Sequence, residues 1–190
     1  MGMIYDTYDS PLGQMRLCCQ GDALIAVTFV GQAYEDKHIP KDAMLGTHPV
    51  LEQAKVWLTQ YFEGKIPDFL PPIRLEGTDF QKRVWELLLE ISYGEIMTYG
   101  ELARKLGCKS AQAIGGAVGR NPISILIPCH RVVGSGGKLT GYAGGVEKKA
   151  FLLRLESMSD QYRRGELCSP TGTCLNDESG TSRAPSPTCI

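Results

Sequence analysis

The sequence predicts an α/β (α+β) protein in which a small antiparallel-sheet unit is followed by a helical unit. Apolar residues alternate in short stretches between residues 15 and 29, which is typical of strands. From Pro49 onward they recur at helical spacing instead. The net charge changes sign near Gly77, from −4 over residues 1–76 to +4 over residues 77–156. These observations predict two units that meet at residues 76 and 77.

The composition is that of an ordinary globular protein. The 190 residues are 43% hydrophobic and 22% charged, which excludes collagen-like, disordered and coiled-coil chains for most of the length. No stretch approaches about 18 uninterrupted apolar residues, and the acidic start MGMIYDTYDS is unlike a signal peptide. Seven scattered cysteines fit no paired disulfide framework. We therefore expect a cytoplasmic protein with free thiols and no membrane contact.

The charge distribution qualifies the formal net charge of −1, which by itself argues against a nucleic-acid binder. Residues 1–76 hold six Lys and Arg against ten Asp and Glu, whereas residues 77–156 hold eleven against seven. One positive module in a neutral protein is typical of a polyanion-binding face. Chance clustering explains the charges alone equally well.

The first unit begins with strands. Turn signals at residues 10–13 and 20–22 separate the alternating stretches, which predicts a hairpin or a small antiparallel sheet. Residues 33–48 are polar and are predicted as a loop. A helix is predicted from Pro49 to the stop at Gly64, with its apolar residues on one broad face.

The second unit is predicted to be helical. Thr78 or Asp79 can cap a helix that ends near Gly94. The spacing of Thr98 and Glu101 is that of a capping box, which predicts a second helix to Leu106.

The next helix follows after a short turn. Gly107 suits a left-handed C-terminal position, and Ser110 can cap residues 111–119. Two short helices joined through glycine are typical of a helix-turn-helix. The helix at 111–119 contains three glycines, each costing about 1 kcal/mol relative to alanine. Close approach to another surface would explain them: either a neighbouring helix, the favoured interpretation, or a nucleic-acid groove.

The chemistry is expected after Pro122. The apolar run 123–127 predicts a buried strand that ends at Pro-Cys-His-Arg, where His130 and Arg131 could hold Cys129 as the nucleophilic thiolate. An inert buried cysteine is the alternative.

A glycine-rich stretch and a helix complete the second unit. The stretch at 134–145 holds six glycines and is predicted to be a binding loop, and a closing helix is predicted from Val146 to Glu156.

These residues carry a family resemblance. The motif Ile-Pro-Cys-His-Arg-Val at 127–132 follows Asn-Pro at 121–122 and precedes Gly-Tyr-Ala-Gly-Gly at 141–145. In this arrangement the chain closely resembles the O6-alkylguanine-DNA alkyltransferases, strongly over 77–156 and more loosely upstream. The resemblance implies a ribonuclease H-like N-terminal domain over 1–76 and a winged-helix-like DNA-binding domain with the helix-turn-helix.

The resemblance also implies a single-turnover reaction. A monomer would bind double-stranded DNA from the minor groove, flip out O6-alkylguanine and transfer the alkyl group irreversibly to Cys129, with O4-alkylthymine as a second candidate substrate. His130, acting through a water and oriented by Glu156, would hold the thiolate. Tyr142 would donate to the guanine, and Asn121 would tie the recognition helix to the active-site segment. No cofactor is needed, and the thioether product ends turnover.

The implied DNA contacts lie on the second unit. Tyr99 would press the target phosphate aside, and the backbone near Val132 would read the guanine edge. The full set of implied DNA-binding residues is Tyr99, Ala111, Gln112, Gly115, Arg120, Arg131, Val132 and Ser135.

Three features depart from the family pattern or lie outside it. Gln112 stands where many members carry an arginine finger, so weaker or more salt-tolerant binding is expected. Ala143 replaces a hydroxyl found in some members. No zinc site is expected, because the spacing required is missing from Cys18, Cys19, His38 and His48.

Two alternatives to the alkyltransferase remain, and one segment lies outside the resemblance. The alternatives are a non-catalytic damage sensor, disfavoured by the presence of Cys129, and a thiol hydrolase, disfavoured because adjacent Cys and His seldom form a dyad. Residues 157–190 are rich in Ser, Thr, Gly and Pro, which predicts a disordered tail.

Overall fold

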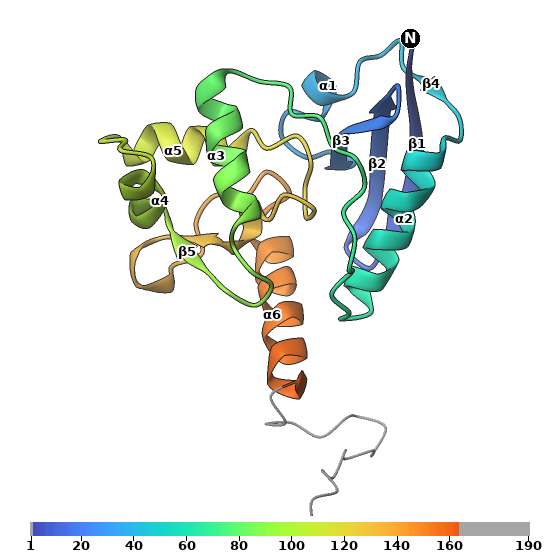
Figure 1. Cartoon of the computed structure of the whole chain (residues 1–190). Coiled ribbons are helices and arrows are strands. Elements are labelled where there is room, and N and C mark those ends of the chain that lie inside the picture. Colours follow the sequence, from blue (N-terminus) through green and yellow to red (C-terminus); the bar gives the residue numbers. More distant parts are fainter. Residues whose placement is uncertain (1, 164–190) are drawn as a thin grey trace, which may run out of the picture.

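A four-stranded sheet forms the first part of the chain in the computed structural model, which describes residues 2–163 (Figure 1). Its strands are β1 (Met3–Ser10), β2 (Gly13–Gln20), β3 (Ala23–Phe29) and β4 (Met44–Leu45). In the order β3-β2-β1-β4, the three long strands are antiparallel and β4 runs parallel to β1. The predicted antiparallel sheet is confirmed.

The sequence pattern missed one long strand. β1 was not predicted because its residues show little alternation, and most of them are only half-buried. The predicted loop 33–48 also contains the single-turn helix α1 (Glu35–His38) and β4.

Helix α2 (Pro49–Phe62) lies beside the sheet (Figure 1). Its Tyr61 contacts His130 and Glu156 of the second unit. Pro49 occupies the first turn, and the ring of His48 accepts a hydrogen bond from the Val50 N–H at 3.4 Å. The apolar face predicted from the sequence is buried, including Trp57 and Tyr61. Gly64 follows the helix at φ 77°, which explains the stop.

The second unit contains four helices and a short parallel strand pair. These elements are α3 (Asp79–Leu89), β5 (Met97–Thr98), α4 (Tyr99–Lys105), α5 (Ala111–Gly119), β6 (Val132–Val133) and α6 (Val146–Arg163). Their caps are largely those predicted. Thr98 and Glu101 form a reciprocal capping box, and the Ser110 hydroxyl accepts from the Ala113 N–H. The predicted helix-turn-helix is thus formed by α4 and α5, with Gly107 at φ 62°.

Helices α3 and α6 end at other residues than predicted. Helix α3 stops at Leu89 and gives way to turns in which the Ile91 N–H bonds to the Leu88 carbonyl. Helix α6 runs on to Arg163, so the part of the expected tail from 157 to 163 is helical. Residues 164–190 of that tail lie outside the described residues.

The buried strand predicted over 123–127 is wrong. The segment is buried but irregular, and its backbone groups bond to the edge of β3: Val27 N–H to the Pro122 carbonyl, and Ser124 N–H to the Val27 carbonyl. Ile125 adopts φ 73°, which breaks strand geometry. Cys129 therefore sits in a 3₁₀ turn, η1 (Cys129–Arg131).

The two units share one hydrophobic core. Within the second unit, Trp85 of α3 bonds to α5. Its indole N–H donates to the Ala117 carbonyl at 2.9 Å, and the side chain is 1% exposed. Gly77 lies against this ring, because a Cβ there would come within 2.7 Å of the Trp85 ring.

We therefore expect Gly77→Ala to destabilise the fold by about 1–3 kcal/mol, the usual cost of overpacking a rigid site. Gly119→Ala is the matched control, because a Cβ there meets nothing within 4 Å and alanine favours the helix. Urea unfolding of both variants measures the difference. A Gly77→Ala protein as stable as the wild type would contradict the packing described.

Candidate active site and DNA-binding surface

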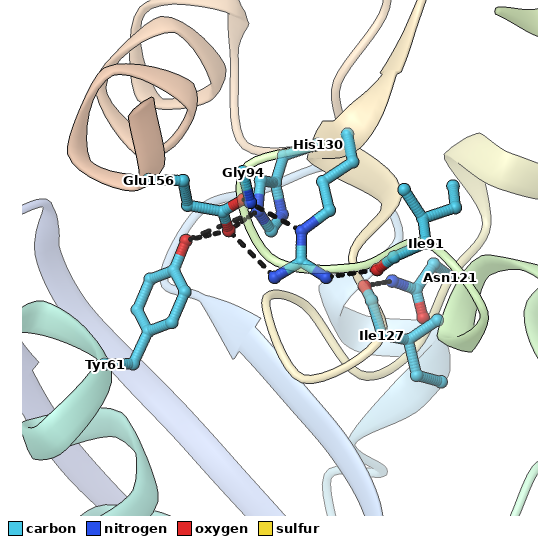
Figure 2. A network of polar contacts seen from close by, with 8 residues as sticks. Tyr61, Ile91, Gly94, Asn121, Ile127, His130 and Glu156 are labelled. Atoms are coloured by element: carbon cyan, nitrogen blue, oxygen red, sulfur yellow. Dashed lines mark hydrogen bonds and ion pairs between the residues drawn. The ribbon is translucent and has the colours of Figure 1, made fainter. Parts of the chain in front are cut away.

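Cys129 is held by the backbone turns around it and by Asn121. Its side chain is 5% exposed, and its N–H bonds to the Ile127 carbonyl at 2.8 Å. The Asn121 amide nitrogen lies 3.1 Å from the Cys129 sulfur. It also donates to the Ile127 carbonyl at 2.9 Å (Figure 2). The Asn121 carbonyl accepts from the Ile123 N–H at 3.0 Å. Asn121 thus links the end of α5 to the segment that carries the thiol.

A buried polar network is centred on Glu156 (Figure 2), and two of its members, His130 and Arg131, belong to the same turn as Cys129. Glu156 from α6 accepts a hydrogen bond from His130 Nε2 at 2.7 Å and from the Tyr61 hydroxyl at 2.8 Å. Arg131 donates to both carboxylate oxygens at 2.9 and 3.0 Å, and the Gly94 N–H donates at 3.0 Å. An ionised carboxylate only accepts, so the proton of His130 is on Nε2 and Nδ1 carries the lone pair.

Burial and neighbouring groups determine the protonation states of Glu156, His130 and Cys129. Glu156 is buried, which alone would raise its pKa, but His130 and Arg131 lower the pKa to about 2, so the carboxylate is ionised. Burial lowers the pKa of His130 despite the opposing Glu156, so the imidazole is neutral near pH 7. Burial raises the pKa of the Cys129 thiol, opposed by the Asn121 hydrogen bond and the Lys149 charge. The resting sulfur is therefore a protonated thiol.

One ring nitrogen of His130 is free to accept a proton. Among residues 2–163 its Nδ1 is buried without a hydrogen-bond partner, whereas Nε2 is bonded. A neutral imidazole with a free lone pair, in the same turn as a thiol, can accept the thiol proton through one water.

Aromatic and cationic groups converge on the thiol from the glycine-rich loop and from α4 and α6. The Tyr99 hydroxyl donates to the Thr140 carbonyl at 3.3 Å, and Lys149 Nζ donates to the same carbonyl at 2.8 Å. The hydroxyl oxygen of Tyr142 is buried, and burial together with nearby Cys129 holds its pKa well above the usual range. Burial also raises the pKa of Tyr99, so both tyrosines keep their protons.

One face of α5 is exposed and is not covered by a neighbouring helix within residues 2–163. The residues that pack inward on the core are Ile114, Ala117 and Val118, whereas Ala111 and Gln112 are exposed. A Cβ at Gly115 would meet only the Tyr99 ring at 3.9 Å, an ordinary contact. A Cβ at Gly119 would meet nothing within 4 Å, so a neighbouring helix does not explain these two glycines, and the favoured interpretation is wrong there.

The remaining residues expected at the DNA interface divide into exposed and buried. Arg120 and Ser135 are exposed, the former above the Tyr34 ring. The expectation that Arg131 contacts DNA is wrong. Its guanidinium is buried and bonds to Glu156 and to the Ile91 carbonyl, so it is not free to contact DNA. Val132 is buried in β6, which leaves only its backbone for a contact.

Sequence reasoning missed Tyr61 and Lys149. Both stand at inward positions of helices, Tyr61 at 0% exposure on α2 and Lys149 at 0% on α6. Tyr61 could not be told from a core aromatic, because its partner Glu156 is 95 residues away. The available signal for Lys149 was its helical spacing from the apolar residues Val146, Leu152 and Leu153.

Two further findings concern metals and membranes. Within residues 2–163, no three His, Cys, Asp or Glu side chains gather closely enough to hold a metal ion. None of the helices in this range is long and apolar enough to cross a bilayer.

Comparison with known proteins agrees with the geometry. Residues 3–75 match the model of the 6-O-methylguanine DNA methyltransferase ribonuclease-like domain, and residues 79–158 match the DNA-binding domain of the same family. The methylated-DNA–protein-cysteine methyltransferase of Haemophilus influenzae is 41% identical over 158 residues, which cover 82% of this chain and 87% of that protein. The Mycobacterium bovis protein of the same name is 44% identical, covering 80% and 91%.

Solved structures give the same result. The crystal structure of Mycobacterium tuberculosis OGT in complex with DNA superposes with a TM-score of 0.75 at 41% identity, covering 82% of this chain and 94% of that one. The mixed fold, with a sheet unit before a helical DNA-binding unit, is confirmed. The chain belongs to the 6-O-methylguanine DNA methyltransferase family.

Proposed function

We propose that this chain repairs DNA by direct reversal, taking the alkyl group of O6-alkylguanine onto its own Cys129 in a single turnover. The observation that carries the proposal is the buried Cys129 thiol in the same turn as His130, whose Nδ1 is free while Glu156 fixes Nε2. Family membership supplies the reaction class, methylated-DNA–protein-cysteine methyltransferase.

The transfer follows from the proton states of the site. His130 takes the thiol proton through a water, and the sulfur attacks the alkyl carbon. The S–C bond forms as the C–O6 bond breaks, and the electron pair passes to the guanine, which receives a proton from Tyr142. The product is a thioether, which has no easy leaving path, so the protein is consumed. O4-alkylthymine fits the same chemistry as a second substrate.

The open face of α5 supports binding in the minor groove of double-stranded DNA. A helix lined by Ala111 and Gly115 can approach the groove closely, and Gln112 in its first turn would fill the space left by the flipped base. Tyr99, beside the loop that carries Tyr142, would press the phosphate aside. Arg120 and Ser135 would contact the backbone, and the Val132 backbone would read the base edge.

The domain limits follow from the same argument. We propose residues 1–76 as a structural domain and residues 77–156 as the DNA-binding and alkyl-acceptor domain, supported by the family matches to 3–75 and 79–158. The protein would act as a monomer. A cytoplasmic location is supported by the free cysteines Cys18, Cys19, Cys108 and Cys129.

The first prediction concerns the acceptor. After incubation with an O6-methylguanine duplex, intact mass should rise once by about 14 Da, one methylene, on the peptide that holds Cys129. Cys129→Ser should show no gain. An unmodified wild-type protein that still binds the duplex would indicate a damage sensor instead.

The second prediction concerns pH. Burial lowers the pKa of His130, so the single-turnover rate constant should be flat near neutral pH and fall only as pH drops below about 6.5 and the base becomes protonated. His130→Asn cannot take the proton, and burial raises the pKa of the thiol. Its rate should therefore climb about tenfold per pH unit toward alkaline pH. Matching profiles for both proteins would exclude His130 as the base.

Another prediction concerns Gln112, which stands where many members of the family carry an arginine. Gln112→Arg adds a positive charge to the exposed first turn of α5, so DNA should bind more tightly at low salt. The slope of log affinity against log salt should steepen by at most about one unit. Titrations in the Cys129→Ser background measure binding without transfer, with Gln112→Lys as a second cationic variant. An unchanged slope would place Gln112 outside the groove.

A further inference from the structure

We propose that Tyr61 is a positioning residue for the alkyl transfer, through which the N-terminal unit fixes the Glu156–His130 pair. The proposal rests on the proposed function, because His130 matters only if Cys129 must lose its proton. Tyr61 belongs to α2, at the surface that this unit presents to the active-site turn. It brings a hydroxyl to the acid and base that stand behind the thiol.

The contacts define what the hydroxyl does. Tyr61 donates to Glu156 Oε1 at 2.8 Å, the same oxygen that accepts from His130 Nε2 at 2.7 Å. Its oxygen lies 3.3 Å from His130 Nε2 and can accept from that N–H. Both contacts favour the tautomer with hydrogen on Nε2, which leaves Nδ1 free as the base.

The ring of Tyr61 cannot easily move. It stacks on Trp57 with centroids 5.5 Å apart, and it meets Tyr93 and His130 edge to face at 5.8 and 6.3 Å. The hydroxyl is therefore held at the network by packing on three sides. If this position served only to fill the core, phenylalanine would do so without a buried hydroxyl that must be paired.

Removing the Tyr61 hydroxyl should change the pKa of His130 in a definite direction. The groups that face His130 are Glu156 and Lys149 from α6, its neighbour Arg131, and Tyr61 from α2. The Tyr61 O–H draws negative charge from Oε1, so its loss leaves a stronger anion beside the imidazole. The pKa of His130 should then rise, and a larger fraction of the base would be protonated near neutral pH.

The test compares Tyr61→Phe with wild type in single-turnover transfer from an O6-methylguanine duplex at saturating DNA. We expect a rate constant about tenfold lower, the size typical of losing one charge-assisted hydrogen bond, and an acid limb displaced to higher pH. DNA affinity should be unchanged. Tyr8→Phe is the matched control, because its hydroxyl bonds Thr59 on the outer part of α2. An unchanged rate and pH profile for Tyr61→Phe would overturn the proposal.

A double-mutant cycle separates positioning from general loss of structure. If Tyr61 acts through the carboxylate, Tyr61→Phe should cost little more in the Glu156→Gln background. Rate effects that multiply in full would overturn the proposal. Rate constants from single turnover do not depend on the active fraction, so partial unfolding of a variant does not imitate the result. A wild-type protein that gains no methyl group would instead reject the proposed function.

Discussion

The buried carboxylate of Glu156 is the interaction on which the arrangement of the site depends. An ionised acid in the interior is costly unless donors surround it, and five hydrogen bonds reach this one. The donors come from α2, from the turn after α3 and from the 3₁₀ turn at Cys129, while the acid itself comes from α6. One charge thereby fixes four separate parts of the chain against one another.

This arrangement assigns different tasks to three consecutive residues. Cys129 faces Asn121 and the glycine-rich loop, whereas His130 and Arg131 face Glu156. Arg131 neutralises the acid, so the imidazole can stay neutral and basic. The raised pKa of Cys129 keeps its sulfur protonated at rest, and the lowered pKa of His130 keeps the imidazole neutral. These proton states are the ones that the proposed transfer requires.

The open face of α5 complements the buried site. Helix propensity opposes glycine at Gly115 and Gly119, and the surrounding protein leaves room for a side chain at both. Their cost is therefore not offset by packing within the described chain. A close approach by DNA, as proposed, would explain it, and Tyr99 beside Gly115 connects that face to the loop over the thiol.

The sequence by itself determined the local elements. The sequence placed a helix cap at Thr78 or Asp79 and a capping box at Thr98. These caps, the start at Pro49 and the stop at Gly64 each depend on contacts within about four residues, so spacing alone predicts them. The Pro-Cys-His-Arg motif likewise indicated the residues proposed as nucleophile and base. Only the tertiary structure decided what those residues contact. The 123–127 segment is irregular and lies buried on the edge of β3, and the Arg131 side chain is buried on Glu156. Tyr61 reached an acid 95 residues away. Such pairings depend on how the two units pack, which no local pattern records.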